Sequence, residues 1–195
     1  MGGFMLMLPL SLVAIFLLLP SANAVDNWDV DGANGKLYIH GALTESACRL
    51  EMESARQDVY LGEIGTGRLP YAGARGEPVT FSLHLADCLR SPSGSRDIRT
   101  GGLIWADNQP AVTVSFRGIR DAHNPQLAKA QGVSGMGLRL EDSENRDVRL
   151  GSKGRPLILT PGENTLTYRV TPERTSANLM AGSYHASIDF HLSYD

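Results

Sequence analysis

The sequence predicts an antiparallel β-sandwich. Apolar and polar residues alternate along several short segments, which is the period of a strand with one buried face. Gly, Pro, Asn and Asp interrupt these segments at short intervals, and no segment carries a convincing helical pattern. Many short strands separated by turns are typical of a sandwich, and no internal repeat is evident.

The N-terminus is typical of an exported protein. An apolar run over residues 4–19 is followed by Pro20 and by the cleavage pattern Ala22-Asn23-Ala24. We therefore expect residues 1–24 to be a signal peptide, although no Lys or Arg precedes the run. The alternative is an uncleaved membrane anchor, but the run is shorter than the ~20 residues that span a bilayer.

Size and charge indicate one domain without a nucleic-acid surface. Cleavage would leave about 170 of the 195 residues, enough for one domain with a real core. The chain has 18 basic and 21 acidic residues and no basic cluster. This balance argues against nucleic acid as a partner.

The two cysteines, Cys48 and Cys88, are predicted to form a disulfide. Both lie in the exported part of the chain, and a lone pair in an oxidising compartment usually pairs. Closing a loop of about 40 residues would stabilise the fold by roughly 4 kcal/mol. A metal pair or a catalytic thiol would need nearby ligands or an activating histidine, and the sequence shows neither.

The first predicted strand follows a polar leader, residues 25–35. Leu37, Ile39, Gly41 and Leu43 share one face of this strand. A glycine within an apolar face marks a bulge or a close approach to another chain, or is simply tolerated. Here it leaves a gap in a hydrophobic row.

The middle of the chain alternates between strands and turns. Residues 58–64 place Val59 and Leu61 on one side, and residues 65–77 form a glycine-rich loop. Clean alternation predicts strands over residues 78–88 and 111–119. The connection 89–108 is rich in turn residues, with a short strand possible over residues 103–105.

The remaining segments before the last stretch follow the same pattern. Residues 121–132 read as a loop, with a helical turn expected over residues 126–130. A hairpin is predicted in which residues 136–140 pair with residues 148–150 across the polar residues 141–147. Two further strands, 157–159 and 166–170, are predicted on either side of the turn Pro161-Gly162.

The last stretch, residues 182–195, predicts a long strand. Its even positions are apolar or aromatic and its odd positions are polar. The chain offers no following strand to pair with it, and an open apolar edge is an aggregation hazard. Two readings stay open: an earlier strand already pairs this edge, or another polypeptide supplies the neighbour.

Several motifs together resemble the subunits of chaperone–usher fimbriae, the type 1 and P pilus family of Gram-negative bacteria. They are GKLYIHGAL from Gly35 followed by Cys48; DVYLGEI; HLADC; GMGLRLEDSENRDVRLG from Gly135; and the terminal strand with Gly182 and the penultimate Tyr194. These motifs cover nearly the whole mature chain. The loop 121–132 favours a minor subunit over the abundant rod subunit.

The resemblance implies an incomplete immunoglobulin-like sandwich that lacks its last strand and is completed by donor-strand exchange. Residues 25–45 would be the N-terminal extension and 46–195 the pilin domain. A periplasmic chaperone would fill the open groove until an outer-membrane usher joins the subunit to its neighbours. The product would be an adhesive fibre on the cell surface.

The resemblance also implies roles for particular residues. Leu37, Ile39, Gly41 and Leu43 look like the donor residues that enter a neighbour's groove. Glu45 lies on the same face but is charged, which departs from the family pattern. The acceptor groove and chaperone-binding residues would be Gly182, Tyr184, Ala186, Ile188, Phe190, Leu192, Tyr194 and Asp195, with the Asp195 carboxylate anchored by basic residues of the chaperone.

Two other functions are less well supported. A tip adhesin or adaptor could use Trp28 or Trp105 to stack on a sugar, but we expect these side chains to pack, and the chain has no room for a separate lectin domain. An enzyme is not expected, because the histidines are scattered and Ser134 lacks the spacing of a nucleophile elbow. No metal or cofactor is predicted.

Overall fold

The computed structural model describes residues 36–40 and 47–194. The chain divides into two units, residues 1–43 and 44–195. In the first unit, residues 36–40 have no regular secondary structure, and Leu37, Tyr38 and Ile39 are each more than 70% exposed. All the described strands and helical turns belong to the second unit.

The second unit is built almost entirely from strands. A single helical turn, α2 (Met52–Ala55), and a 3-10 turn, η2 (Thr66–Arg68), precede the long strands. The strands are β1 (Arg49–Leu50), β2 (Val79–Cys88), β3 (Ser93–Arg96), β4 (Leu103–Ala106), β5 (Ala111–Gly118), β6 (Ala128–Lys129), β7 (Met136–Asp142), β8 (Leu157–Ile158), β9 (Gly162–Arg174) and β10 (Ile188–Tyr194). No helix in the described part of the chain is long and apolar enough to cross a membrane.

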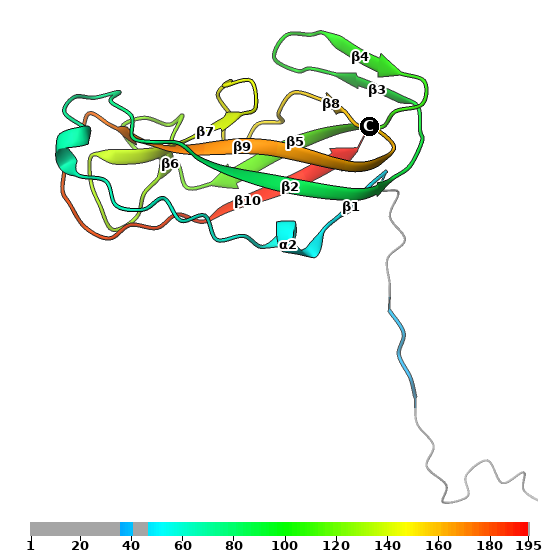
Figure 1. Ribbon diagram of the computed structural model, residues 1–195, viewed down its shortest axis with the longest axis horizontal. Helices are drawn as coiled ribbons and strands as arrows, with labels where there is room; N and C mark the ends of the chain where they lie inside the picture. The colour runs from blue at the N-terminus through cyan, green and yellow to red at the C-terminus, as the bar shows by residue number, and fades with distance from the viewer. Residues whose placement is uncertain (1–35, 41–46, 195) are drawn as a thin grey trace, which may run out of the picture. The chain divides into compact units, whose positions relative to one another are not determined.

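These strands form two layers and a separate hairpin (Figure 1). One layer is a five-stranded sheet in the order β1-β2-β9-β7-β6, and the other is a three-stranded sheet in the order β10-β5-β8. All pairings between the strands are antiparallel. The hairpin β3–β4 projects from the connection between β2 and β5.

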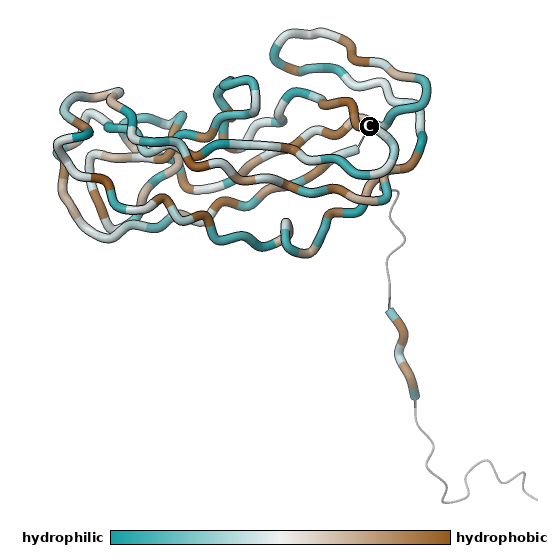
Figure 2. The backbone as a smooth tube through the Cα atoms, in the orientation of Figure 1, coloured by the Kyte–Doolittle hydropathy of each residue, from teal (hydrophilic) through white to brown (hydrophobic). Residues whose placement is uncertain are grey.

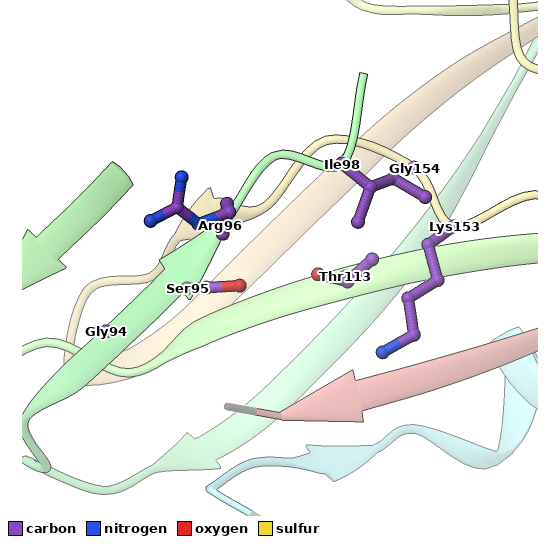
Figure 3. A pocket seen from close by; sticks show the side chains of 7 residues that line it. All are labelled: Gly94, Ser95, Arg96, Ile98, Thr113, Lys153 and Gly154. Carbon is purple, nitrogen blue, oxygen red and sulfur yellow. The ribbon is translucent and has the colours of Figure 1, made fainter. Parts of the chain in front are cut away.

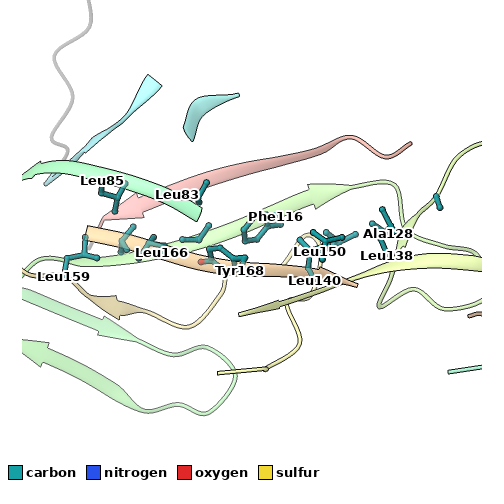
Figure 4. Packing of buried hydrophobic residues seen from close by; sticks show 14 of the residues in the cluster. Leu83, Leu85, Phe116, Ala128, Leu138, Leu140, Leu150, Leu159, Leu166 and Tyr168 are labelled. Atoms are coloured by element: carbon teal, nitrogen blue, oxygen red, sulfur yellow. The ribbon is translucent and has the colours of Figure 1, made fainter. Parts of the chain in front are cut away.

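The core lies between the two sheets, because alternate residues of each strand point inward. On β2, Leu83 and Leu85 are 1% exposed, and Phe116 of β5 is 2% exposed. The Phe116 ring packs edge-on against Tyr168 of β9, with ring centroids 4.9 Å apart. Figure 4 shows these side chains filling the space between the layers, and Figure 2 shows the matching alternation of apolar and polar residues along the strands. The predicted sandwich is therefore confirmed.

The predicted disulfide is also confirmed. Cys48 and Cys88 are bonded, with their Cα atoms 4.1 Å apart. The backbone N–H of Leu89 donates to the carbonyl of Ala47 at 2.8 Å beside this bond. The disulfide thus fixes the start of β1 to the end of β2.

One local prediction was wrong, and two others were incomplete. The expected helical turn over residues 126–130 is instead a tight turn followed by β6, which pairs with β7. The predicted hairpin over 136–150 turns back on β7, with a bridge between Glu141 and Asp147 and a hydrogen bond from the Val148 N–H to the Leu140 carbonyl at 2.9 Å, but residues 148–150 form no strand. The short strand predicted over 103–105 is confirmed as β4, which pairs with β3, a strand that was not predicted.

The last strand is shorter than predicted, since β10 begins at Ile188 rather than near Gly182. The preceding residues pack against the loop that follows β6, where His185 exchanges two backbone hydrogen bonds with Gln131. A Cβ atom on Gly182 would lie 2.9 Å from the carbonyl oxygen of Gly132. This close approach takes residues 182–187 out of the sheet.

A buried ion network ties β7 to β9 on the face away from the core. The Glu173 side chain is 5% exposed and accepts hydrogen bonds from Arg139, with Nη2 to Oε1 at 2.8 Å, and from Arg75, with Nε to Oε2 at 2.9 Å. Arg139 also contacts Asp147 at 2.7 Å. Burial alone would raise the pKa of Glu173, but the hydrogen bonds and charges of Arg139 and Arg75 outweigh it and lower the pKa.

Candidate functional site

The sandwich has an open side where one edge of each sheet is unpaired. Among the described residues, β10 pairs only with β5 in the three-stranded sheet, and β1 pairs only with β2 in the five-stranded sheet. Both edge strands lie on the same side of the molecule (Figure 1). An unpaired strand edge presents a row of free backbone N–H and C=O groups that another strand can bind.

The inner face of β10 leaves apolar side chains partly uncovered at this edge. Ile188, Phe190, Leu192 and Tyr194 pack against the core but are only half-buried. The Phe190 ring lies 6.4 Å from Phe116, centroid to centroid, and Phe116 itself is fully buried on the neighbouring strand. These four side chains form a stripe that is covered on the side toward β5 and uncovered on the side away from β5.

Two residues before β10 extend the stripe. Tyr184 and Ala186 are half-buried against the core, while His185 between them is exposed. The Tyr184 hydroxyl is buried and has no hydrogen-bond partner among the described residues. Burial, with a smaller contribution from the nearby phenol of Tyr60, raises the pKa of Tyr184, so the hydroxyl keeps its proton and can donate it.

The opposite rim comes from the segment between the disulfide and β2. Leu50, Leu61 and Ile64 pack partly buried against the core, whereas Met52 and Tyr60 are 89% and 82% exposed. We use the word groove for the unpaired edge of β10 together with the stripe from Tyr184 to Tyr194 and this rim. The alternation of Val59 and Leu61 hinted at this rim, but nothing in the sequence placed it beside β10.

The predicted site residues fall into three groups. The first group, Tyr184, Ala186, Ile188, Phe190, Leu192 and Tyr194, is partly buried against the core. Gly182 lies outside the groove, exposed, where the chain packs against Gly132. Of the predicted donor residues, Leu37 and Ile39 are exposed, while Gly41 and Leu43 lie outside the described residues, as does Asp195.

Two cavities elsewhere are not part of this groove. A cavity of about 250 Å³ lies between β3, β5 and residues 153–154 (Figure 3). There the Ser95 and Thr113 hydroxyls point toward one another, but Arg96 points away, so the charged groups do not converge on a ligand. A larger cavity of about 720 Å³ has mixed lining from β4, β5, β8, β9 and the loop 142–155, and no residue of β10.

The chemistry of the other candidate residues is limited. The described residues contain no group of three or more His, Cys, Asp or Glu that could hold a metal ion. Trp105 was expected to pack, but its side chain is 69% exposed. It lies on the outer face of β4 opposite Gly94, which offers no side chain to cover the indole ring. Trp28 lies outside the described residues.

Comparison with known proteins identifies the family. A family model described as "Fimbrial protein" matches residues 37–195. The chain belongs to the fimbrial protein family. Among its relatives are the Fimbria A protein of Serratia marcescens, 29% identical over 89% of this chain and 88% of that protein, and the PAP fimbrial minor pilin protein of Escherichia coli, 28% identical over 86% and 78%.

Solved structures agree with the family at the level of the fold. The P pilus rod subunit PapA has a TM-score of 0.62 and 22% identity, covering 77% of this chain and all of that one. A subunit from a chaperone–usher pilus has the same TM-score over 85% of this chain. The predicted identity as a pilin with an immunoglobulin-like fold is confirmed. The chain is a structural fimbrial subunit that associates with other pilin subunits, and not an enzyme.

Proposed function

We propose that this pilin is a link in a fibre assembled by donor-strand exchange. In this proposal the groove accepts a strand from one neighbour, while Leu37, Ile39, Gly41 and Leu43 enter the groove of the next. Residues 25–45 are the extension that carries the donor strand, and residues 46–195 are the pilin domain. The observation that carries the proposal is the unpaired edge of β10 with its half-buried apolar stripe.

The exposure of the donor stretch supports the same reading. Leu37 and Ile39 are each 84% exposed, which is unusual for two large aliphatic side chains on one face. Burying Leu37, Ile39 and Leu43 in a groove would release about 5 to 9 kcal/mol before the costs of association. The exposed apolar segment and an edge strand that, among the described residues, pairs on one side only are complementary.

Before assembly, the open edge needs protection from aggregation. We propose that a periplasmic chaperone lends a strand to the groove, and that basic residues of this chaperone bind the Asp195 carboxylate. The subunit then passes to an outer-membrane usher, where the donor strand of the next subunit replaces the chaperone strand. The N-terminal signal peptide, residues 1–24, directs the export that this route requires.

Hydrogen exchange at β10 tests the proposal. In an antiparallel ladder alternate residues direct their N–H groups to the same neighbour, so half of the β10 amides face β5 and half face the open edge. We expect the open-edge amides to exchange rapidly in the mature chain. A peptide of residues 35–47 in excess should slow them at least tenfold and leave the β5-facing amides unchanged. Equal protection of both sets without peptide would refute an open edge.

A second candidate is direct attachment to a receptor through Trp105. Its exposed indole opposite Gly94 offers a flat aromatic face suited to stacking. If attachment uses Trp105, replacing Trp105 with alanine should weaken attachment and leave fibre assembly unaffected. The two candidate functions can therefore be tested separately.

A further inference from the structure

The larger cavity, of about 720 Å³, is a candidate binding site separate from the groove. It is lined by the β3–β4 hairpin, by the loop 142–155 and by residues of β5, β8 and β9, and by none of the described residues of β1 or β10. The hairpin and the loop are tied together by a hydrogen bond from Arg99 Nη1 to the carbonyl of Asp147 at 3.1 Å. The volume lies within the range of small-molecule sites, about 300–1,000 Å³.

The side chains around this cavity carry an excess of positive charge. Five basic and three acidic residues line it, and each of the three carboxylates already has partners. Asp142 pairs with Arg146 at 2.8 Å, and Asp147 pairs with Arg139 at 2.7 Å. Asp97 accepts hydrogen bonds from two backbone N–H groups of its own turn, at 2.8 and 3.4 Å. Part of the basic lining is therefore left without a counter-charge.

Three of the basic residues can meet an anionic ligand. Arg149 and Lys153 form no ion pair among the described residues. In the same part of the chain Arg155 reaches only Glu144, at 3.6 Å, and Glu144 is already paired with Arg146 at 2.9 Å. A cleft with an excess of one sign of charge concentrates ligands of the opposite sign.

The backbone that carries Lys153 is fixed against β5. The Gly151 N–H donates to the carbonyl of Phe116 at 2.6 Å. The Gly154 N–H donates to the carbonyl of Val114 at 2.9 Å, and a Cβ atom on Gly154 would lie 2.5 Å from that carbonyl oxygen. Only glycine fits this contact, which holds Lys153 on a rigid backbone. A site on rigid backbone loses less conformational entropy when it binds a ligand.

The rest of the lining combines apolar side chains with uncharged polar groups. Ile104 and Leu157 are half-buried at the cavity. The uncharged polar side chains are those of Thr100, Ser143, Ser152, Asn164, Thr165 and Thr167. Hydroxyl and amide groups can exchange hydrogen bonds with the hydroxyls of a sugar, and apolar side chains can cover its C–H groups. An acyl chain would cover the same polar groups without hydrogen-bonding them, which is costly.

We propose that this cavity binds an acidic saccharide, whose carboxylate or sulfate group is held by Arg149, Lys153 and Arg155. The sugar ring lies against Ile104 and Leu157. Charge-assisted hydrogen bonds from the three cations supply the strongest contacts. This function goes beyond donor-strand exchange, because the described residues of the groove and of the cavity do not overlap.

Binding of matched sugars to the mature chain tests the proposal. The probes are sialyllactose, which carries a carboxylate, a sulfated heparin disaccharide, and neutral lactose. We expect at least one acidic sugar to bind, and lactose to bind at least about tenfold more weakly. Tighter binding of sialyllactose would identify a carboxylate ligand, and tighter binding of the heparin disaccharide a sulfate ligand. Equal binding of lactose, or binding of phosphatidylglycerol vesicles but of neither acidic sugar, or no binding at all, would overturn the proposal.

Paired variants test whether the cations of the cavity act. Replacing Arg149 and Lys153 together with alanine should weaken binding of the acidic sugar at least about tenfold. The control chain carries Arg117→Ala and Lys129→Ala, which remove the same charge at exposed positions outside the cavity. Its affinity for the sugar should change little. Equal losses in the two chains would mean a general charge effect and would overturn the site.

Methyl NMR spectra test where the sugar binds. The Ile104 and Leu157 signals should shift when the acidic sugar is added, whereas those of Ile188 and Leu192 on β10 should not. Unchanged Ile104 and Leu157 signals would place the sugar outside the cavity and overturn the assignment. The chain without Arg149 and Lys153 should still bind the peptide of residues 35–45. Failure of the wild-type chain to bind this peptide would count against donor-strand exchange and not against the saccharide site.

Discussion

Replacing Ile39 with aspartate will stop this pilin from joining the next subunit, while replacing Tyr38 with aspartate will not. Ile39 belongs to the apolar face of the proposed donor strand, and Tyr38 belongs to the opposite face. Burying an unpaired carboxylate among the apolar side chains of the groove costs several kcal/mol, comparable to the whole gain from the donor strand. We expect the ladder of higher oligomers to disappear from non-reducing gels of Ile39→Asp and to persist for Tyr38→Asp.

The two variants are matched, because both side chains are more than 70% exposed within their own chain. Neither substitution should therefore alter the fold of the subunit or its acceptance of a strand from a neighbour. Chaperone binding, which is proposed to use the groove and not the extension, should survive in both. Normal fibre growth by Ile39→Asp would contradict the donor assignment.

Replacing Glu173 with glutamine is expected to lower the free energy of unfolding by about 3 kcal/mol at neutral pH, because it leaves Arg139 and Arg75 without their shared carboxylate. The Arg139 side chain is only 10% exposed and cannot recover full hydration. Chemical denaturation of the two forms measures the difference. Glu163→Gln, an exposed position on the same strand, is the control and should change stability little.

The same network predicts a pH dependence. The folded-state pKa of Glu173 is lowered, so its contribution is complete above the unfolded pKa of about 4.3 and is lost as the pH falls toward the folded value. Below about pH 4.3 the wild type should therefore lose stability more steeply than Glu173→Gln. Parallel pH profiles of the two forms would contradict this assignment.

The strands that were predicted well are those that turn alternate apolar side chains toward the core. Residues 79–88 and 111–118 both do so, although residues 111–114 are buried on both faces, so local pattern and tertiary packing agree. The strand β3 was missed because its sequence Ser-Gly-Ser-Arg has no apolar residue to carry a period. The last strand was predicted too long because its alternation continues through residues that pack on Gly132 instead of in the sheet.

The groove was only half predictable. Its β10 side carries a strict period of two, which the sequence displays. Its other rim, with Leu50, Leu61 and Ile64, comes from an irregular segment whose position depends on long-range packing and on the disulfide at Cys48. The Glu173 network was invisible for the same reason, since Arg75 and Glu173 are 98 residues apart.

Thermal unfolding with a donor peptide tests most directly the claim that this fold is completed by a strand from another chain. The oxidised mature chain, at low concentration, would be melted alone and with a large excess of a peptide of residues 35–45. Binding to the folded state alone at 1,000 times Kd contributes about 4 kcal/mol, which raises Tm by about 10 °C. A peptide carrying Ile39→Asp and Leu43→Asp should leave Tm unchanged. A high Tm that neither peptide alters would mean that the edge of β10 is already paired, and would contradict the account.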